Sequence, residues 1–177
     1  MTNNLIRTAW ANVKANSKFI CIQTYSGYAS CRADHRGAVH WLTPTASDEE
    51  IGTALLNALS KSRFVLPGPR TDVWVHPDAT FDAELYDLKK LGEGYTNWVE
   101  SIKLRYGYTQ RKLIFKDMKS CSFMARLGKI IMMPSHHEKL EAWSGEGISE
   151  DAYVIVSGDS SPSEIGAGVR LALDRCS

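Results

Sequence analysis

Histidine is the residue type in this chain best suited to catalysis, because imidazole acts as a general base and as a metal ligand near neutral pH. The sequence holds five histidines, and none has the HExxH spacing that places two imidazoles on one helical face. His136 and His137 are adjacent, whereas His35, His40 and His76 are scattered. We therefore predict no catalytic residues, and a hydrolase built on His40 and His137 is the third of our hypotheses.

Glycine and cysteine patterns give no cofactor or metal motif. The triplets Gly92–Gly94 and Gly145–Gly147 lack the third glycine of a phosphate-binding loop and predict turns. The sequence has neither a Walker-type phosphate loop nor a GxSxG motif. The cysteines lie far apart without a CxxC pair, which predicts free, mostly buried thiols at Cys21, Cys31, Cys121 and Cys176. We expect no metal and no cofactor.

Charged residues gather in segments of alternating sign, although the net charge of the chain is only +1. One acidic segment contains Asp78, Asp82, Glu84 and Asp87, and the other contains Glu138, Glu141, Glu146, Glu150 and Asp151. Such residues can form solvated helix faces that suit the helix dipole, or they can bind a basic partner. The sequence leaves both interpretations open.

A basic segment between the acidic ones combines positive charge with aromatic side chains. It contains Lys103, Arg105, Arg111, Lys112, Lys116 and Lys119, interleaved with Tyr106, Tyr108 and Phe115. This composition can hold phosphates and stack bases. We favour the alternative, a solvated helix face followed by a strand whose alternate residues enter the core, because the whole chain is nearly neutral.

The composition is that of a globular protein with one domain. The chain has 177 residues, of which 44% are hydrophobic, and a domain of this size buries roughly 70% of the surface of its unfolded chain. The longest apolar run, Ile130–Met133, is too short to cross a bilayer. The start, Met1–Arg7, lacks the apolar region of a signal peptide, so we expect a cytoplasmic protein.

Two segments far apart in the chain predict equivalent amphipathic helices. Ser47–Gly52 (SDEEIG) recurs as Ser161–Gly166 (SPSEIG), and each copy has the serine and glutamate of a capping box. Apolar residues follow at matching spacing: Ile51, Leu55, Ala58 and Leu59, then Ile165, Val169, Ala172 and Leu173. A helical glycine costs about 1 kcal/mol relative to alanine, so the matched glycines predict another backbone packed closely there.

Apolar runs before these helices predict antiparallel strands. They are residues 19–22 and 38–42 in the first half, and residues 113–115, 122–125, 130–133 and 153–156 in the second. We therefore predict a single α+β domain, residues 1–177, made of two antiparallel sheet-plus-helix repeats. The internal pseudo-repeat covers approximately residues 17–66 and 110–177.

The middle of the chain separates the two repeats. Phe81, Leu85 and Leu88 recur at helical spacing and predict a helix that ends before Gly92. Residues 95–106 predict a second helix that ends before Gly107, although this run is also compatible with a strand. The intervening stretch after the first repeat, 66–70 (LPGPR), predicts an exposed turn.

Four segments resemble the immunity proteins of bacterial contact-dependent growth inhibition (CDI), the CdiI family. They are Ser17–Tyr28 (SKFICIQTYSGY), Gly37–Leu42 (GAVHWL), Tyr106–Tyr108 (YGY) and Pro134–Trp143 (PSHHEKLEAW). The likeness extends over nearly the whole chain. It implies an antitoxin that binds, in the cytosol, the C-terminal toxin domain of a cognate CdiA exoprotein, commonly a nuclease. Some of these immunity proteins are similar to the Whirly fold, which has two sheet-plus-helix repeats.

The resulting prediction is an immunity protein that neutralises a nuclease toxin, more specifically a ribonuclease, by covering its active site or substrate groove. Acidic groups can mimic phosphates, and a tryptophan ringed by polar groups suits a binding hot spot, although Trp143 is also compatible with a helical core residue. The predicted toxin-binding residues are Asp78, Asp82, Glu84, Asp87, Glu138, Glu141, Trp143 and Glu146.

The alternative is a Whirly-like single-stranded nucleic-acid-binding protein. Its candidate residues are Arg105, Tyr106, Tyr108, Arg111 and Lys112. Affinity that falls steeply with salt would distinguish it from a protein inhibitor. Under the leading hypothesis we expect no direct nucleic-acid contact and no membrane contact.

Overall fold

The structure, a computed structural model, describes residues 5–177. The first four residues of Met1–Arg7, the segment from which we expect a cytoplasmic protein, lie outside it. The strands are β1 (Ala9–Ala15), β2 (Ile20–Gly27), β3 (Cys31–Ala33), β4 (Val39–Leu42), β5 (Val65–Leu66), β6 (Thr80–Phe81), β7 (Lys119–Arg126), β8 (Lys129–Pro134), β9 (His136–Lys139), β10 (Ala142–Ser144) and β11 (Val154–Ser157). The helices are α1 (Asp48–Ser60), α2 (Leu88–Tyr106), α3 (Arg111–Phe115) and α4 (Pro162–Asp174), with short 3-10 helices at Ala83–Tyr86 and Glu150–Ala152. Within residues 5–177, none of the helices combines the length and the apolar character that crossing a membrane requires.

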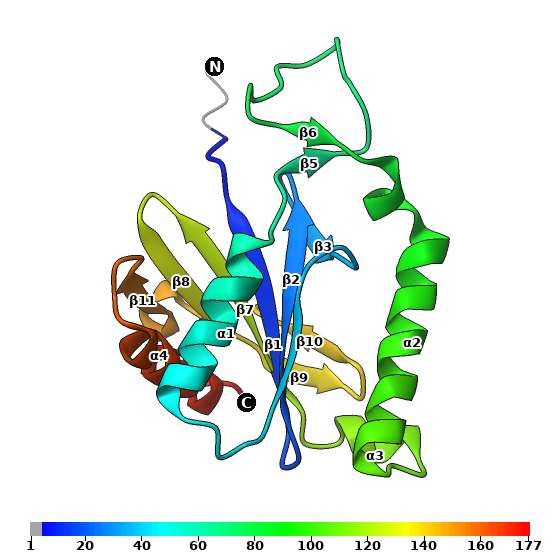
Figure 1. The fold of residues 1–177 in the computed structure, drawn as a ribbon, viewed down its shortest axis with the longest axis vertical. Coiled ribbons are helices and arrows are strands. Elements are labelled where there is room, and N and C mark those ends of the chain that lie inside the picture. The colour runs from blue at the N-terminus through cyan, green and yellow to red at the C-terminus, as the bar shows by residue number, and fades with distance from the viewer. Residues whose placement is uncertain (1–4) are drawn as a thin grey trace.

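A seven-stranded antiparallel sheet forms the centre of the molecule (Figure 1). Its order is β11-β8-β7-β1-β2-β3, and β4 pairs with β2 next to β3. The central pair is β1 with β7, in which Asn12 lies opposite Ser122. The predicted α+β class is confirmed, as are the strands predicted at residues 19–22, 38–42, 122–125, 130–133 and 153–156.

Two units of similar topology meet at the central strand pair. In the first unit β1, β2 and β4 precede α1, and in the second β7, β8 and β11 precede α4. The units span residues 9–60 and 119–174, which differs from the predicted 17–66 and 110–177, because β1 precedes the first range and a helix, α3, occupies the start of the second. The likeness to the Whirly fold stays a prediction.

The two long helices of these units pack against each other through their backbones. Both begin with the predicted capping box, at Ser47 and at Ser161. A Cβ atom added to Gly52 would overlap with the carbonyl oxygen of Pro162, and one added to Gly166 would overlap with that of Asp48. The close backbone approach predicted from the matched glycines is therefore confirmed.

The main core lies between one face of the sheet and these two helices. Strand residues such as Val13, Ile22 and Phe123 meet Leu55 of α1 and Val169 of α4 there, all of them almost fully buried. Alternate residues of the same strands point to the opposite face. A second, smaller core on that opposite face holds α2 and α3 against the start of β2, and it contains Phe19, Cys21, Trp98, Val99, Ile102, Ile114, Phe115 and Met118.

The middle of the chain differs from the sequence-based prediction in three ways. One helix, α2, replaces the two predicted ones, so the triplet Gly92–Gly94 lies inside a helix and does not form a turn. Phe81 belongs to β6, outside any helix. Residues 113–115, predicted as a strand, belong to α3, because Ile114 and Phe115 enter the second core from one side of a helical turn. The exposed turn after β5 is confirmed.

Candidate binding groove

The face of the sheet opposite α1 and α4 is only partly covered. α2 stands along one side of it, and the β9–β10 hairpin occupies another (Figure 1). Between them lie two cavities of about 110 and 530 Å³, both lined by Lys14 and Tyr95. We call them together the open-face groove. Its principal residues are Asn12, Lys14, Gln23, Tyr25, Leu91, Tyr95, Trp98, Ser122, Met133 and Trp143.

The alternation of side chains along β1 and β2 determines which residues form the floor of the open-face groove. On β1, Ala11, Val13 and Ala15 enter the main core, so Asn12 and Lys14 point to the groove. β2 supplies Gln23 and Tyr25 in the same way. The floor therefore consists of polar side chains whose strand neighbours are core residues, and the strands that carry them are fixed by that core.

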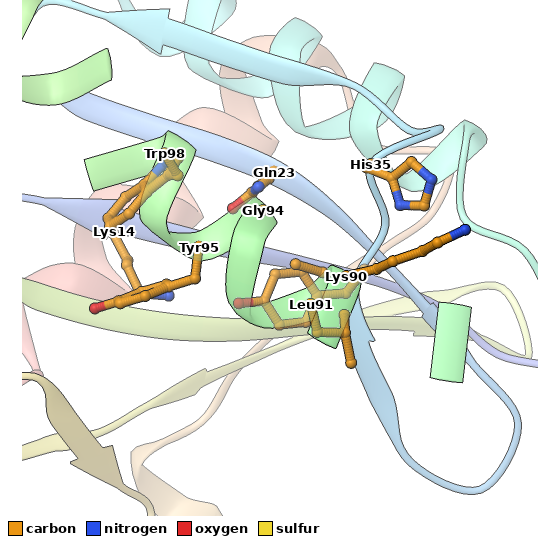
Figure 2. A pocket seen from close by; sticks show the side chains of 10 residues that line it. Lys14, Gln23, His35, Lys90, Leu91, Gly94, Tyr95 and Trp98 are labelled. Atoms are coloured by element: carbon orange, nitrogen blue, oxygen red, sulfur yellow. The ribbon is translucent and has the colours of Figure 1, made fainter. Parts of the chain in front are cut away.

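Lys14 lies at the centre of the groove floor. Its ammonium donates a hydrogen bond to Asn12 Oδ1 at 2.6 Å. The same nitrogen lies 5.8, 5.9 and 5.6 Å from the ring centroids of Tyr25, Trp98 and Trp143, within the range of cation–π attraction. Figure 2 shows Lys14 beside Tyr95 and Trp98 at one end of the smaller cavity, and His35 with Lys90 at the other.

Glu141, one of the predicted toxin-binding residues, has its carboxylate engaged at the rim of the groove. Arg111 donates to both of its oxygens at 2.6 and 2.7 Å, and the Tyr95 hydroxyl donates at 2.7 Å. The hydrogen bonds from Arg111 hold the pKa of Glu141 below its ordinary value. Burial and the neighbouring Glu141 carboxylate raise the pKa of Tyr95. This cluster ties α2, α3 and the β9–β10 hairpin together.

The first acidic segment forms an ionic network with residues distant in sequence. Arg63 donates to Asp34 and to Asp82, each at 2.7 Å. Glu84 pairs with Lys90 at 2.7 Å and with Arg36 at 3.2 Å. The Arg63 hydrogen bond lowers the pKa of Asp82, and the Lys90 hydrogen bond lowers that of Glu84.

The other two acidic residues of this segment have local partners. Asp87 is the N-cap of α2, and its side chain accepts from the backbone of Lys89 and Lys90. Asp78 pairs with Arg7 at 3.6 Å. Each acidic residue of this segment thus has a capping or ion-pair partner, and its role in toxin binding stays a prediction.

The remaining predicted residues lie on or after the β9–β10 hairpin. Glu138 and Glu146 are exposed. Trp143 is half-buried on β10, a strand, and its Nε1 donates to the Met118 carbonyl at 2.9 Å. Its ring stacks on His137 at 4.9 Å between centroids. The structure thus brings Glu141 and Trp143 to the groove and separates them from Asp78, Asp82 and Asp87.

The residues of the nucleic-acid alternative serve largely in internal contacts. The ring of Tyr106 stacks on buried Phe19 at 4.9 Å, and the Arg105 guanidinium lies 5.2 Å from the ring centroid of Trp41. Lys18 covers Tyr108 at 4.4 Å, and Arg111 is paired with Glu141. Only Lys112 of this set is an exposed cation without one of these contacts in the described chain.

The histidines of the hydrolase hypothesis lie on opposite faces of the sheet. His40 on β4 contacts Asn57 of α1 at 2.8 Å, on the helix-covered face. His137 stacks on Trp143 beside the open-face groove. They cannot act on one substrate together. In the part of the chain that the structure describes, no three His, Cys, Asp or Glu side chains gather as metal ligands would.

Sequence reasoning missed the residues at the centre of the groove. Lys14, Gln23, Tyr25 and Tyr95 had no part in the predicted site. The signal that could have found the first of them is the alternation of residues 9–15 (AWANVKA), in which small or apolar residues alternate with Asn12 and Lys14.

Comparisons with known proteins agree along the whole chain. The sequence is 50% identical over 174 residues to the immunity protein CdiI-YPIII of Yersinia pseudotuberculosis serotype O:3 (strain YPIII), covering 98% of each chain. The structure matches a chain of the CdiA-CT/CdiI toxin and immunity complex from Yersinia pseudotuberculosis with a TM-score of 0.96 and 49% identity, over 98% of this chain and 100% of that one. A protein of unknown function from Neisseria meningitidis matches with a TM-score of 0.81 and 37% identity, over 100% of both chains.

The fold and these likenesses define the class of α+β immunity proteins. The family model described as CDI immunity protein (CdiI) matches residues 9–176. This chain therefore belongs to the CDI immunity protein family, and the resemblance noted in the sequence is confirmed.

Proposed function

We propose that this chain neutralises the C-terminal toxin domain of a cognate CdiA exoprotein by binding it, without catalysis of its own. The observation that supports this most is the match, over 98% of the chain at a TM-score of 0.96, to a chain of a toxin and immunity complex. The open-face groove offers a concave surface with apolar, aromatic and polar side chains, as protein-binding sites commonly do.

We propose further that the toxin domain is a nuclease, and more specifically a ribonuclease. The exposed carboxylates of Glu138 and Glu146, near Trp143, support this proposal, because basic groups that bind phosphate would be attracted to them. The other predicted toxin-binding carboxylates already have partners within this chain. Asp78, Asp82, Glu84, Asp87 and Glu141 would therefore contribute mainly by shaping the surface.

The first experiment expresses this chain together with the toxin domain encoded immediately upstream of its gene. We expect the two proteins to co-purify and the cells to survive induction of the toxin. Purified toxin domain is then incubated with RNA and with DNA, with and without this chain. Cleavage of RNA that this chain suppresses supports the ribonuclease proposal, whereas cleavage of DNA alone corrects the substrate. Absence of both association and rescue contradicts the immunity function.

The contribution of the hairpin carboxylates can be measured separately. The double variant Glu138→Gln/Glu146→Gln should lower the association rate with the toxin domain, most clearly at low salt, because it removes charge that steers encounter. The control Glu49→Gln/Asp159→Asn changes the net charge equally at exposed sites on α1 and on the turn before α4. Equal association rates for the two variants would show that Glu138 and Glu146 do not steer the encounter with the toxin.

A further inference from the structure

Resting on the proposed function, we infer that Lys14 is the binding subsite for a single carboxylate side chain, an aspartate or glutamate, of the toxin domain. At the centre of the open-face groove the immunity protein would then supply the cation and the toxin the anion, whereas the acidic segments predict the opposite arrangement of charge. The observation that carries it is a half-buried lysine in a groove, whose ammonium lies within 6 Å of three aromatic ring centroids and has no counter-ion among residues 5–177.

The hydrogen bonds of Lys14 are incomplete within this chain. An ammonium has three donors, and the described contacts use one of them, to Asn12 Oδ1. Among residues 5–177, no carboxylate oxygen lies within 4.0 Å of its nitrogen. The other cations at the groove differ in this respect, because Lys90 is paired with Glu84 and Arg111 with Glu141.

The surroundings of Lys14 favour a carboxylate ligand over water alone. The rings of Tyr25, Trp98 and Trp143 exclude part of the hydration shell that an exposed lysine keeps, and cation–π attraction compensates for that loss only partly. A carboxylate that enters the groove would recover the lost solvation through a charge-assisted hydrogen bond. The free protein therefore holds an ammonium to which a partner's carboxylate can supply the missing counter-ion and hydrogen bonds.

The smaller cavity also fits the rest of an acidic side chain. Its volume of about 110 Å³ suits a small group, and Leu91 and Trp98 line it with apolar surface for methylene groups. The Gln23 side chain points into the same cavity (Figure 2), and an amide can donate to a second carboxylate oxygen. His35 at its far end offers a ring nitrogen as a further hydrogen-bonding group.

The test compares Lys14→Met with Lys14→Arg by titration calorimetry against the purified cognate toxin domain. Lys14→Met keeps the length and apolar stem but removes the charge, and we expect it to weaken binding at least about 30-fold. Lys14→Arg keeps the charge and should retain most of the affinity. Lys61→Met, an exposed charge removal at the C-terminal end of α1, should leave the affinity unchanged. Urea unfolding of each variant shows whether the fold is intact.

A double-mutant cycle then identifies the ligand. Aspartates and glutamates of the toxin domain are replaced one at a time by asparagine or glutamine, and each variant is titrated with the wild type and with Lys14→Met. We expect one toxin carboxylate whose replacement weakens wild-type binding strongly and causes almost no further loss with Lys14→Met. If no toxin carboxylate couples to Lys14, the proposal is wrong.

The outcomes separate this inference from the proposed function. A wild-type protein that does not bind the toxin domain contradicts the immunity function itself. A wild-type protein that binds, together with a folded Lys14→Met variant of equal affinity, overturns only the carboxylate subsite. A salt-dependent affinity for single-stranded RNA that Lys14→Met abolishes would assign the site to phosphate and would overturn the proposal as well. If Lys14→Met unfolds, Lys14→Gln, which removes the charge but keeps a polar side chain, replaces it both in the affinity comparison and in the cycle with toxin variants.

Discussion

At the scale of single residues, Asp34 has the most demanding environment in the chain. Its side chain is fully buried, and its carboxylate accepts hydrogen bonds from Arg63 and from the Ser26 hydroxyl. Burial opposes ionisation, but these hydrogen bonds outweigh it and hold the pKa of Asp34 below its ordinary value. Asp82, on the other side of Arg63, also has a lowered pKa, chiefly because of the Arg63 hydrogen bond.

These lowered pKa values predict how stability depends on pH. A carboxylate with a folded-state pKa below its unfolded value of about 3.9 stabilises the fold above that value. The contribution is lost as the pH falls through the folded-state pKa. We expect the free energy of unfolding, measured by urea titration, to decrease from roughly pH 5 downward. A value that stays constant between pH 6 and pH 3 would contradict this assignment.

Replacing Asp34 tests the same network directly. Asp34→Asn removes the bidentate partner of the Arg63 guanidinium, which keeps only its pair with Asp82, and we expect it to lower the free energy of unfolding at pH 7 by about 1.5–3 kcal/mol. The acid-dependent part of the loss should shrink in this variant. Asp72→Asn is the control, because its exposed pair with Arg70 lies on the surface and its loss should leave the unfolding midpoint unchanged.

The candidate site shows what sequence could predict about single residues and what it could not. Counting charges located both acidic segments, but it could not reveal their partners, since Arg111 and Glu141 lie 30 residues apart and meet only in the fold. Strand alternation in residues 9–15 could have placed Lys14 on the open face of the sheet. Its significance, however, comes from three rings on β2, α2 and β10 that surround it, and the alternation does not reveal them.

At the scale of elements, the crossing of α1 and α4 depends on two glycines. Gly52→Ala or Gly166→Ala would bring a methyl group into overlap with a backbone carbonyl that cannot move without shifting its helix. We expect each to destabilise the protein by about 1–3 kcal/mol, measured by thermal or urea unfolding. Gly92→Ala in α2 is the matched control, since a Cβ there meets no atom within 4 Å, and it should stabilise by up to about 1 kcal/mol.

The elements were predictable where local chemistry and tertiary packing agree. Capping boxes and helical spacing identified α1 and α4, because both signals lie within one segment. In α2 they conflict: Gly92 and Gly94 disfavour a helix by about 1 kcal/mol each, but Trp98, Val99 and Ile102 bury one face of it in the second core. That burial depends on residues of β2 and α3, which no local pattern contains.

At the scale of the whole molecule, one strand joins the two cores. Ile20 and Ile22 of β2 enter the main core, whereas Cys21 between them enters the second one. Loss of either core would expose the opposite face of the same strand, so we expect unfolding to be a single cooperative transition.

The tryptophans allow a test of this cooperativity. Trp98, Trp41 and Trp143 belong to or pack against the second core, so their fluorescence reports mainly on that core. Far-UV circular dichroism reports on all helices and strands. Under urea the two signals should change with the same midpoint and slope. A fluorescence midpoint at clearly lower urea would show that α2 and α3 detach before the sheet unfolds.

The backbone contact between α1 and α4 also determines what a partner meets on the opposite face. Helices that touch through their backbones cannot slide past each other without overlap, so the strands beneath them keep a fixed spacing. The groove floor is formed by the alternate side chains of those strands. The surface is thus preorganised: its backbone entropy was lost during folding, and a partner does not have to order it again. More of the free energy of each contact then appears as affinity.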